Sequence, residues 1–308
     1  MIAPTPDQFA ACFLGLALGD AWGAPFEGGP LERLLWRLIG TTRQGARRWT
    51  DDTQMSMDVA ESLLACGRLD QADLARRFAH SYHWSRGYGP GAARVLKRIR
   101  RGQDWQSASR AVYRDGSYGN GGAMRAPILA LFCARQPDAL AETVRQATLI
   151  THAHPLGIEG AQLVARATAL ALAHTPPDAT LATLSQEAQH APFAQKLALA
   201  THWLAQGTDV SPKTLAASLG NGIAAADACI SAIFIALHFA ERPFKEMLDF
   251  VARCGGDTDT LGAMAGALWG AHRGTQALPE GLLARLEQRA RIETLGRRLH
   301  GVGLDGVS

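Results

Sequence analysis

Hydrophobic side chains recur along the chain at helical spacing, between residues that typically start or stop helices. The segment TPDQFAACFLGLALGDAWG is the first example, with Thr5 before a proline and Gln8 three positions after Thr5. Thr and Gln at this spacing can bind the free backbone groups of a first helical turn, so we expect a helix to begin here. Gly15, Gly19 and Gly23 follow at four-residue intervals. If the helix continues through them, they leave one face open to another backbone or to a ligand.

The same periodicity predicts helices along the rest of the chain and indicates no strand. No segment alternates polar and hydrophobic residues as a half-buried strand would, and no Val/Ile/Thr-rich hairpin occurs. We expect a single all-α domain over residues 1–308, with no internal repeat and no long linker. Further helices are expected within residues 55–67, 71–84, 90–102, 104–114, 123–136, 137–154, 155–175, 193–207, 211–221, 225–241, 243–256, 254–271 and 279–299.

Composition places the chain among soluble globular proteins. Hydrophobic residues make up 47% of the 308 positions and charged residues 19%, and the net charge of +3 calls for neither a nucleic-acid nor a membrane partner. The five cysteines show no CxxC spacing, which is typical of reduced thiols in a cytoplasmic protein. The start MIAPTPDQF lacks the features of a signal peptide, and the apolar run 9–17 is too short to span a bilayer. We therefore expect a soluble, cytoplasmic protein.

Two short acidic motifs stand where helices are expected to begin. WTDDTQM places Asp51 and Asp52 beside threonines, and GGDTDT places Asp257 and Asp259 among glycines and threonines. Helix capping explains one such motif, since Thr and Asp oxygens bind free N–H groups and negative charge suits a helix N-terminus. Together the two motifs contain more carboxylates than helix capping requires. If these four carboxylates converge, they repel one another unless cations neutralise them. Because oxygen ligands suit Mg²⁺, Mn²⁺ or Ca²⁺, we expect the motifs together to hold two divalent ions.

A glycine-rich segment, GSYGNGGAMR, and a histidine pair suggest an anion site. The glycines allow backbone conformations that expose N–H groups to a phosphate, although a simple turn has the same composition. Ser117 and Asn120 can add hydrogen bonds, and Tyr118 can stack on a base. His152 and His154 follow in THAHPLGIEGAQ without the Cys or third His of a zinc site. A hydrogen bond to a ligand phosphate or a role at a helix start is expected instead.

The last motif is GDAWGAPFE, in which Glu27 lies on a loop shaped by Gly and Pro and could also be a solvated loop acid. In this order, the five motifs resemble the ADP-ribosylglycohydrolase family, from about residue 8 to about residue 272. WTDDTQM and GGDTDT carry the resemblance most specifically, and GNGGAMR supports it.

The resemblance implies an orthogonal all-α fold, a centre of two Mg²⁺ or Mn²⁺ ions, and hydrolysis that releases ADP-ribose from an acceptor. The metal ligands that it implies are Thr50, Asp51, Asp52, Asp257, Asp259 and Thr260. The ligand-binding residues that it implies are Ser117, Tyr118, Gly119, Asn120, Gly121, Met124 and His152. Tyr118 would contact the adenine and His152 a phosphate. Glu27 matches an acid on a flexible loop of the family, and either Glu27 or Asp257 would act as general acid or base.

Two alternatives remain beside this interpretation. All-α prenyl synthases also bind Mg²⁺ through Asp-rich motifs, but they need DDxxD, and here Asp51 and Asp52 are followed by Thr, Gln and Met. The other alternative is an immunity or regulatory protein that binds ADP-ribose or a toxin with little turnover. The expected partner is an ADP-ribosylated protein or a small molecule containing ADP-ribose, and we expect a monomer. The acceptor linkage (arginine, serine, a base or a metabolite) stays open.

Overall fold

The computed structural model describes residues 3–302, and within that range the chain is all-α, as predicted. The described residues form seventeen α-helices and only isolated β-bridges. The helices are α1 (Pro6–Gly23), α2 (Pro30–Ile39), α3 (Asp51–Cys66), α4 (Gln71–Ser81), α5 (Pro90–Arg100), α6 (Trp105–Arg110), α7 (Ala126–Phe132), α8 (Leu140–Leu149), α9 (Pro155–Leu172), α10 (Pro177–Glu187), α11 (Ala191–Ala205), α12 (Pro212–Ser218), α13 (Ala225–His238), α14 (Phe244–Cys254), α15 (Thr258–Arg273), α16 (Glu280–Leu283) and α17 (Arg289–His300). Short 3₁₀ turns are η1 (Ala24–Phe26), η2 (Trp84–Arg86), η3 (Asn120–Gly122), η4 (Pro137–Ala139) and η5 (Thr275–Ala277).

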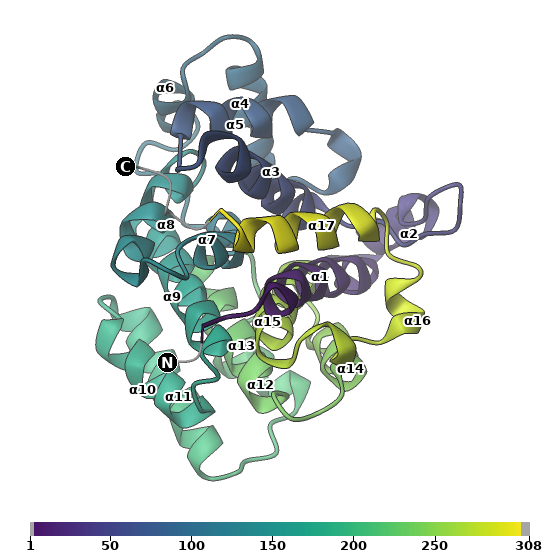
Figure 1. Ribbon diagram of the computed structural model, residues 1–308, viewed down its shortest axis with the longest axis vertical. Helices are drawn as coiled ribbons and strands as arrows, with labels where there is room; N and C mark the ends of the chain where they lie inside the picture. The colour runs from purple at the N-terminus through teal and green to yellow at the C-terminus, as the bar shows by residue number, and fades with distance from the viewer. Residues whose placement is uncertain (1–2, 303–308) are drawn as a thin grey trace.

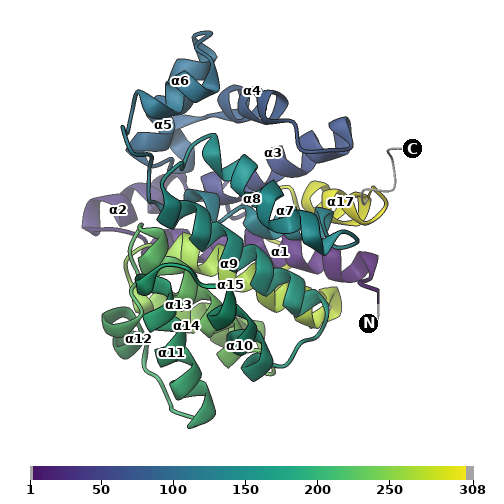
Figure 2. The same cartoon turned by 90° about the vertical axis from the view of Figure 1, so that its left-hand side faces the viewer.

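Helix α1 runs through the centre of the molecule and lies against α15. Figure 1 shows the two helices crossing beneath α17, with α4 to α6 at one end of the molecule and α10 and α11 at the other. The view in Figure 2 keeps this order and shows α9 in front of α15. α1 begins with the predicted capping box, in which Thr5 and Gln8 bind each other's backbone N–H groups.

The predicted open face of α1 receives another backbone. A side-chain carbon added at Gly19 would lie 1.8 Å from the Gly262 carbonyl oxygen of α15, and one added at Gly15 would lie 2.2 Å from that of Gly266. A side-chain carbon added at Gly23 would likewise lie 2.2 Å from the Thr258 carbonyl oxygen. Because only glycine lacks Cβ, this sequence allows two helices to pack backbone to backbone.

Within residues 3–302, one helical segment, α1 with the following turn η1, is long and apolar enough to cross a membrane. The segment Pro6–Phe26 is long and apolar enough, yet 83% of its apolar window is buried inside the protein. Its side chains belong to the hydrophobic core, together with those of α3, α13 and α15. Core helices of folded proteins can be equally long and apolar, and the burial of α1 identifies it as a core helix.

One expected helix was wrong, and two helices were not predicted. Segment 279–299 is two helices, because the chain between α16 and α17 pairs with residue 47 and Gln288 takes a left-handed conformation with φ of 55°. The helices α2 and α10 were not predicted. α2 was predictable, since Leu31, Leu34, Leu35 and Leu38 have helical spacing, but these side chains are 47–77% exposed rather than buried. The single-domain boundary stays a prediction.

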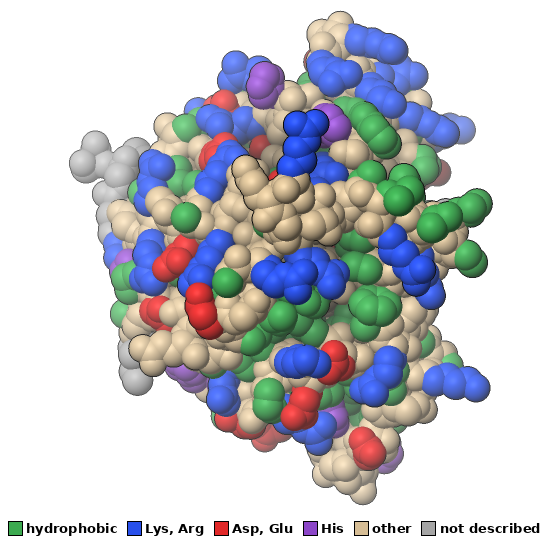
Figure 3. All heavy atoms as spheres, turned by 90° about the vertical axis from the view of Figure 1, so that its right-hand side faces the viewer, with side chains coloured by type: hydrophobic (Ala, Val, Ile, Leu, Met, Phe, Trp, Pro, Cys, Tyr) green, Lys and Arg blue, Asp and Glu red, His purple; other side chains and the backbone are tan. Residues whose placement is uncertain are grey.

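The face that carries α2 is rich in cations. Figure 3 shows many Lys and Arg side chains there, with exposed hydrophobic side chains between them and fewer acids. The segment that contains Glu27 joins η1 to α2, so this face lies next to one of the candidate site residues.

Candidate metal and ADP-ribose site

Asp20 in α1 fixes the start of α3, where the first acidic motif lies. Its carboxylate accepts hydrogen bonds from the backbone N–H groups of Thr50, at 2.9 Å, and Thr53, at 3.0 Å. The Thr53 hydroxyl donates a third, at 2.6 Å. N–H groups at a helix start have no carbonyl partner within the helix, so a buried acid from another helix satisfies them. Burial raises the pKa of Asp20 to about 6, although these hydrogen bonds oppose the rise.

Two glycines in the left-handed region position the second acidic motif. Gly255 has φ of 66° and Gly256 φ of 72°, and a side chain on Gly256 would lie 2.1 Å from the Asn221 backbone oxygen. The Asp257 N–H donates to that same oxygen at 2.8 Å. This turn places Asp257 immediately before α15 and Asp259 in its first turn. Substitution at these glycines is strained because a Cβ disfavours positive φ.

Carboxylates from separate segments meet at these helix starts. Glu27, Asp257 and Asp259 each have a carboxylate oxygen within 4.8 Å of the others. Asp51 and Asp52 face the same cluster and interact with its charges. Asp52 is 2% exposed and Asp259 4% exposed, so little water screens their charge. The structure thus brings the acids predicted to bind metal, from the starts of α3 and α15, together with Glu27, the candidate general acid or base from the segment between α1 and α2.

Burial and mutual repulsion disfavour the charged forms of these acids. Burial raises the pKa of Asp51, Asp52 and Asp259 well above the usual range, and neighbouring carboxylates raise it further. A hydrogen bond from the Thr260 side chain opposes the rise at Asp52. A cation bound among these groups would remove the repulsion.

Two oxygens in the cluster lack a hydrogen-bond donor among the described residues. They are Asp52 Oδ2 and Asp259 Oδ1, and both are buried. Buried polar atoms nearly always have a partner, so their orientation favours a bound cation. Carboxylate and hydroxyl oxygens are the ligands that Mg²⁺ and Mn²⁺ prefer. The residues therefore fit a divalent metal, while its identity and number stay predictions.

The glycine-rich loop contacts the acid cluster directly through Asn120. Its Nδ2 atom donates to Asp257 Oδ2 at 2.5 Å, and its backbone N–H donates to the Ile223 oxygen at 2.9 Å. The Tyr118 ring is 58% exposed beside this contact. The Ser117 hydroxyl accepts a hydrogen bond from the Gly119 N–H at 3.3 Å.

His152 packs against the same loop, whereas Met124 does not reach the surface. A side-chain carbon at Gly121 would lie 2.4 Å from His152 Cε1, so the loop needs glycine at this position. Met124 is 3% exposed and belongs to the hydrophobic core. His154 caps α9 through a hydrogen bond from the Leu156 N–H at 3.1 Å, which agrees with the helix-start role considered for it.

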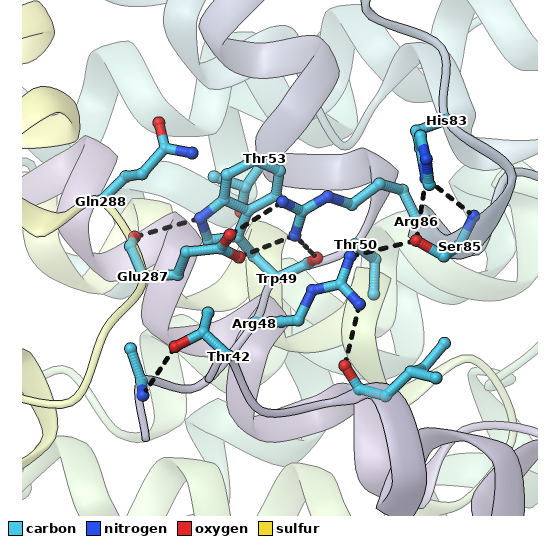
Figure 4. A network of polar contacts seen from close by, with 12 residues as sticks. Thr42, Arg48, Trp49, Thr50, Thr53, His83, Ser85, Arg86, Glu287 and Gln288 are labelled. Atoms are coloured by element: carbon cyan, nitrogen blue, oxygen red, sulfur yellow. Dashed lines mark hydrogen bonds and ion pairs between the residues drawn. The ribbon is translucent and has the colours of Figure 1, made fainter. Parts of the chain in front are cut away.

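A partly buried ion pair holds the segment that leads to the first acidic motif. The Arg86 guanidinium donates to both carboxylate oxygens of Glu287, at 2.7 and 2.9 Å, and to the Trp49 carbonyl at 2.8 Å (Figure 4). The same guanidinium lies 3.5 Å from the centre of the Trp49 ring. Trp49 Nε1 donates to the Glu287 backbone oxygen at 3.1 Å. Residues from two distant segments, Arg86 and Glu287, thus fix Trp49 immediately before Thr50.

Comparison with known proteins gives a match along nearly the whole chain. The family model described as ADP-ribosylglycohydrolase matches residues 1–306. The chain belongs to the ADP-ribosylglycohydrolase family. The resemblance found in its motifs is thereby confirmed.

Individual relatives of this ADP-ribosylglycohydrolase family member match at similar lengths. ADP-ribosylhydrolase ARH3 of Danio rerio is 33% identical, over 95% of this chain and 90% of the relative. ARH3 of Homo sapiens is 31% identical, over 96% of this chain and 93% of the relative. ADP-ribosyl-dinitrogen reductase glycohydrolase of Rhodospirillum rubrum is 28% identical, over 93% and 92%. A solved structure described as an ADP-ribosylglycohydrolase-related protein complex has a TM-score of 0.73 at 28% identity. The match covers 97% of this chain and 98% of that one.

Several residues around the site of this family member were not found from the sequence. Asp20 lies in GDAWGAPFE, a motif in which only Glu27 was predicted as a site residue. Its place between Gly19 and Gly23, both expected on the open face of α1, was a signal that could have identified it. Asn221, Arg86 and Glu287 had no such signal, because their partners are far away in the chain.

Proposed function

We propose that this protein is a metal-dependent hydrolase that cleaves the C1″ glycosidic bond of ADP-ribose attached to a protein side chain or a related acceptor, releasing ADP-ribose. The observation that carries the proposal is the convergence of Glu27, Asp257 and Asp259 within 4.8 Å beside the glycine-rich loop. The names of the relatives support it, since those proteins are described as ADP-ribosylhydrolases or as an ADP-ribosyl-dinitrogen reductase glycohydrolase.

The metal centre that we propose contains two Mg²⁺ or Mn²⁺ ions. The ligands would be the side-chain oxygens of Thr50, Asp51, Asp52, Asp257, Asp259 and Thr260. Such ions, when bound, orient hydroxyl groups of the substrate and lower the pKa of a bound water. Asp20 supports the ligands indirectly, because it holds the backbone of Thr50 and Thr53.

The protein's own groups then have separate tasks. The glycine-rich loop and the Ser117 and Asn120 side chains would hold the ribose and pyrophosphate, and the exposed Tyr118 ring would stack on the adenine. Cleavage develops positive charge on the ribose ring, which the nearby carboxylates stabilise. Glu27 or Asp257 would take the proton of the attacking water or supply one to the leaving group.

Separate substitutions distinguish the two candidate acids. Asp257 is held by Asn120 and by the backbone turn before α15, as expected for a metal ligand. Glu27 is half-buried and belongs to the segment before α2. If Glu27 is the general acid or base, Glu27→Gln abolishes release while Mg²⁺ still binds in calorimetry. Asp257→Asn is then expected to lose both ADP-ribose release and Mg²⁺ binding. If Asp257→Asn instead abolishes release while Mg²⁺ still binds, the proton transfer is assigned to Asp257.

The experiment that tests the function is a release assay. Purified protein with Mg²⁺ or with EDTA is given arginine-ADP-ribosylated and serine-ADP-ribosylated protein separately, and free ADP-ribose is measured. Release from one substrate that EDTA abolishes supports the proposal and names the linkage. ADP-ribose binding without release from either substrate would favour the immunity or regulatory alternative.

We further propose that the protein acts as a monomer in the cytoplasm, on ADP-ribosylated protein or a small molecule containing ADP-ribose. Its scattered cysteines are free, and four of the five are buried. This suits a reducing compartment. Light scattering of the purified protein tests the monomer, and a dimer mass would contradict it.

A further inference from the structure

Arg125, the last residue of GNGGAMR, is a fully buried cation without an ion-pair partner among the described residues. Its guanidinium donates hydrogen bonds to the Gly121 carbonyl, to the Ala147 carbonyl at 3.2 Å and to Thr151 Oγ1 at 2.9 Å. It lies 5.0 Å from the Phe78 ring, and its exposed fraction is 0%. The charges of Asp51 and Asp52 favour this cation from beyond ion-pair distance, but they do not offset its burial. Burying an arginine without a direct carboxylate partner is costly, so this position is expected to carry a role beyond packing.

The hydrogen bond from Arg125 determines the direction of the next one. A guanidinium can only donate, so Thr151 Oγ1 must accept from it. The Thr151 hydroxyl proton is then left for another partner, and His152 Nδ1 lies 2.8 Å away. If Nδ1 carried a proton, the buried hydroxyl would accept from both Arg125 and His152, and its own proton would have no acceptor among its side-chain partners. A hydroxyl that donates to an unprotonated Nδ1 satisfies both groups.

The His152 ring is neutral at physiological pH, so its single proton lies on Nε2. Burial and the nearby charge of Arg125 lower the pKa of His152 to about 3. The Nε2 atom faces the glycine-rich loop, 3.2 Å from where a Cβ of Gly119 would stand and 2.8 Å from that of Gly121. The Nε2 atom of His152 makes no hydrogen bond to a described residue. An N–H donor without a partner thus points at the loop.

We propose that Arg125 and Thr151 are positioning residues that hold His152 in the Nε2–H tautomer, so that one neutral N–H donor faces a phosphate of the bound ADP-ribose. The identity of the acceptor rests on the proposed function, whereas the tautomer is a property of the free protein. The opposite tautomer would turn a nitrogen lone pair toward the phosphate oxygens and repel them. Arg125 itself does not contact the ligand.

The tautomer can be measured directly. Protein with ¹⁵N-labelled histidine rings is studied at pH 7 by long-range ¹H–¹⁵N correlation, which distinguishes Nε2–H from Nδ1–H. The His152→Gln variant assigns the His152 signals among those of the ten histidines. We expect the Nε2–H pattern in the wild type and in Thr151→Ser, which keeps the hydroxyl. Thr151→Val, which has the same shape without the hydroxyl, is expected to show a mixture of both tautomers.

Kinetics provide a second measurement. Thr151→Val is expected to raise KM for the ADP-ribosylated substrate about 10-fold with a smaller change in kcat, while Thr151→Ser stays within about twofold of the wild type. If Thr151→Val does not fold, Thr151→Ala replaces it. An Nδ1–H pattern in the wild type would overturn the inference, and so would an unchanged pattern in the variant without the hydroxyl. An Nε2–H pattern in a protein that releases no ADP-ribose would support this inference and contradict the proposed function.

Discussion

At the scale of single residues, the acids of the site oppose folding in the absence of a metal. Asp52 and Asp259 are buried, each leaves one oxygen without a donor, and burial raises the pKa of both. Buried carboxylates of this kind are common at functional sites, where stability is given up for activity. Their cost to folding and their affinity for a cation have the same physical origin.

Asp259→Asn is the substitution that separates these two effects. In EDTA, the free energy of unfolding is expected to rise by about 0.5–2 kcal/mol, because one repelling charge is removed. In Mg²⁺, the stabilisation by the ion is expected to fall sharply, because a charged ligand is lost. Denaturant unfolding with and without Mg²⁺ measures both.

The matched control is Asp249→Asn. Asp249 is 56% exposed, and its one ion pair among the described residues is with Lys245 one turn away, so both quantities should stay close to those of the wild type. Full Mg²⁺ stabilisation in Asp259→Asn would show that this acid is not a metal ligand.

At the scale of helices, contacts between distant elements hold the two acidic motifs in place. α1 packs on α15 through glycines and also provides Asp20 to α3. Because Asp20 and Gly19 are neighbours, a shift of α1 against α15 would displace the first acidic motif relative to the second. Packing and site geometry are therefore coupled.

Gly19→Ala tests this coupling. The added carbon would lie 1.8 Å from the Gly262 carbonyl oxygen, so the helices must separate. We expect a loss of about 3 kcal/mol or more in unfolding free energy, together with weaker Mg²⁺ binding. Gly281→Ala in α16 is the control, since a carbon added there meets nothing within 4 Å. Equal stability of the two variants would contradict the backbone contact.

The ion pair of Arg86 and Glu287 supports the site from the other side. Its side chains are 10% and 14% exposed, so removing Glu287 leaves a poorly solvated cation. We expect Glu287→Ala to cost about 2–4 kcal/mol in unfolding free energy and to weaken Mg²⁺ binding through Trp49. Thermal unfolding and calorimetry measure the two effects. Glu293→Ala, which removes a more exposed pair with Arg297, should cost less than about 0.5 kcal/mol.

At the scale of the whole molecule, the buried acids determine how stability depends on pH. Burial raises the pKa of Asp20 to about 6 and of Asp58 to about 7, from a usual value of 3.8. The folded protein therefore binds more protons than the unfolded chain above about pH 4. The stability that these groups contribute is complete below that pH and is lost as pH rises through 6 to 7. The low pKa of His152, about 3, and the lowered pKa of His238 have the opposite effect below about pH 6.5, but five buried acids have a raised pKa.

We therefore expect metal-free protein to become less stable between about pH 5 and about pH 7.5. Urea unfolding in EDTA at several pH values measures this slope. Asp58→Asn should flatten its upper part, because the charges that act on Asp58 are those of Glu61, Arg77 and Arg291 and not those of the acid cluster. Its partner, the Ser81 hydroxyl, can still donate to the amide oxygen. A stability that rises steadily over this range would contradict the expectation.

Much of the fold and of the site could be predicted from the sequence because the relevant signals are local. The capping box at Thr5, the glycine spacing of α1 and the apolar periodicity depend on residues within about one helical turn of each other. The two acidic motifs were recognisable for the same reason, since each lies at a helix start where its own neighbours mark it. The all-α fold and the family followed from these features.

The tertiary structure alone decided which distant groups meet. Arg86 and Glu287 are 201 positions apart, and Asn120 and Asp257 are 137 apart, so no spacing rule relates them. The break between α16 and α17 likewise follows from pairing with residue 47, against a continuous helical pattern in the sequence. Helical periodicity describes which face of a helix is buried, whereas the partner of that face depends on how all the helices pack together. For that reason the sequence predicted the acidic motifs and most of the helices, and only the packed structure determined how Asp20 and Arg86 hold the segments around the acid cluster.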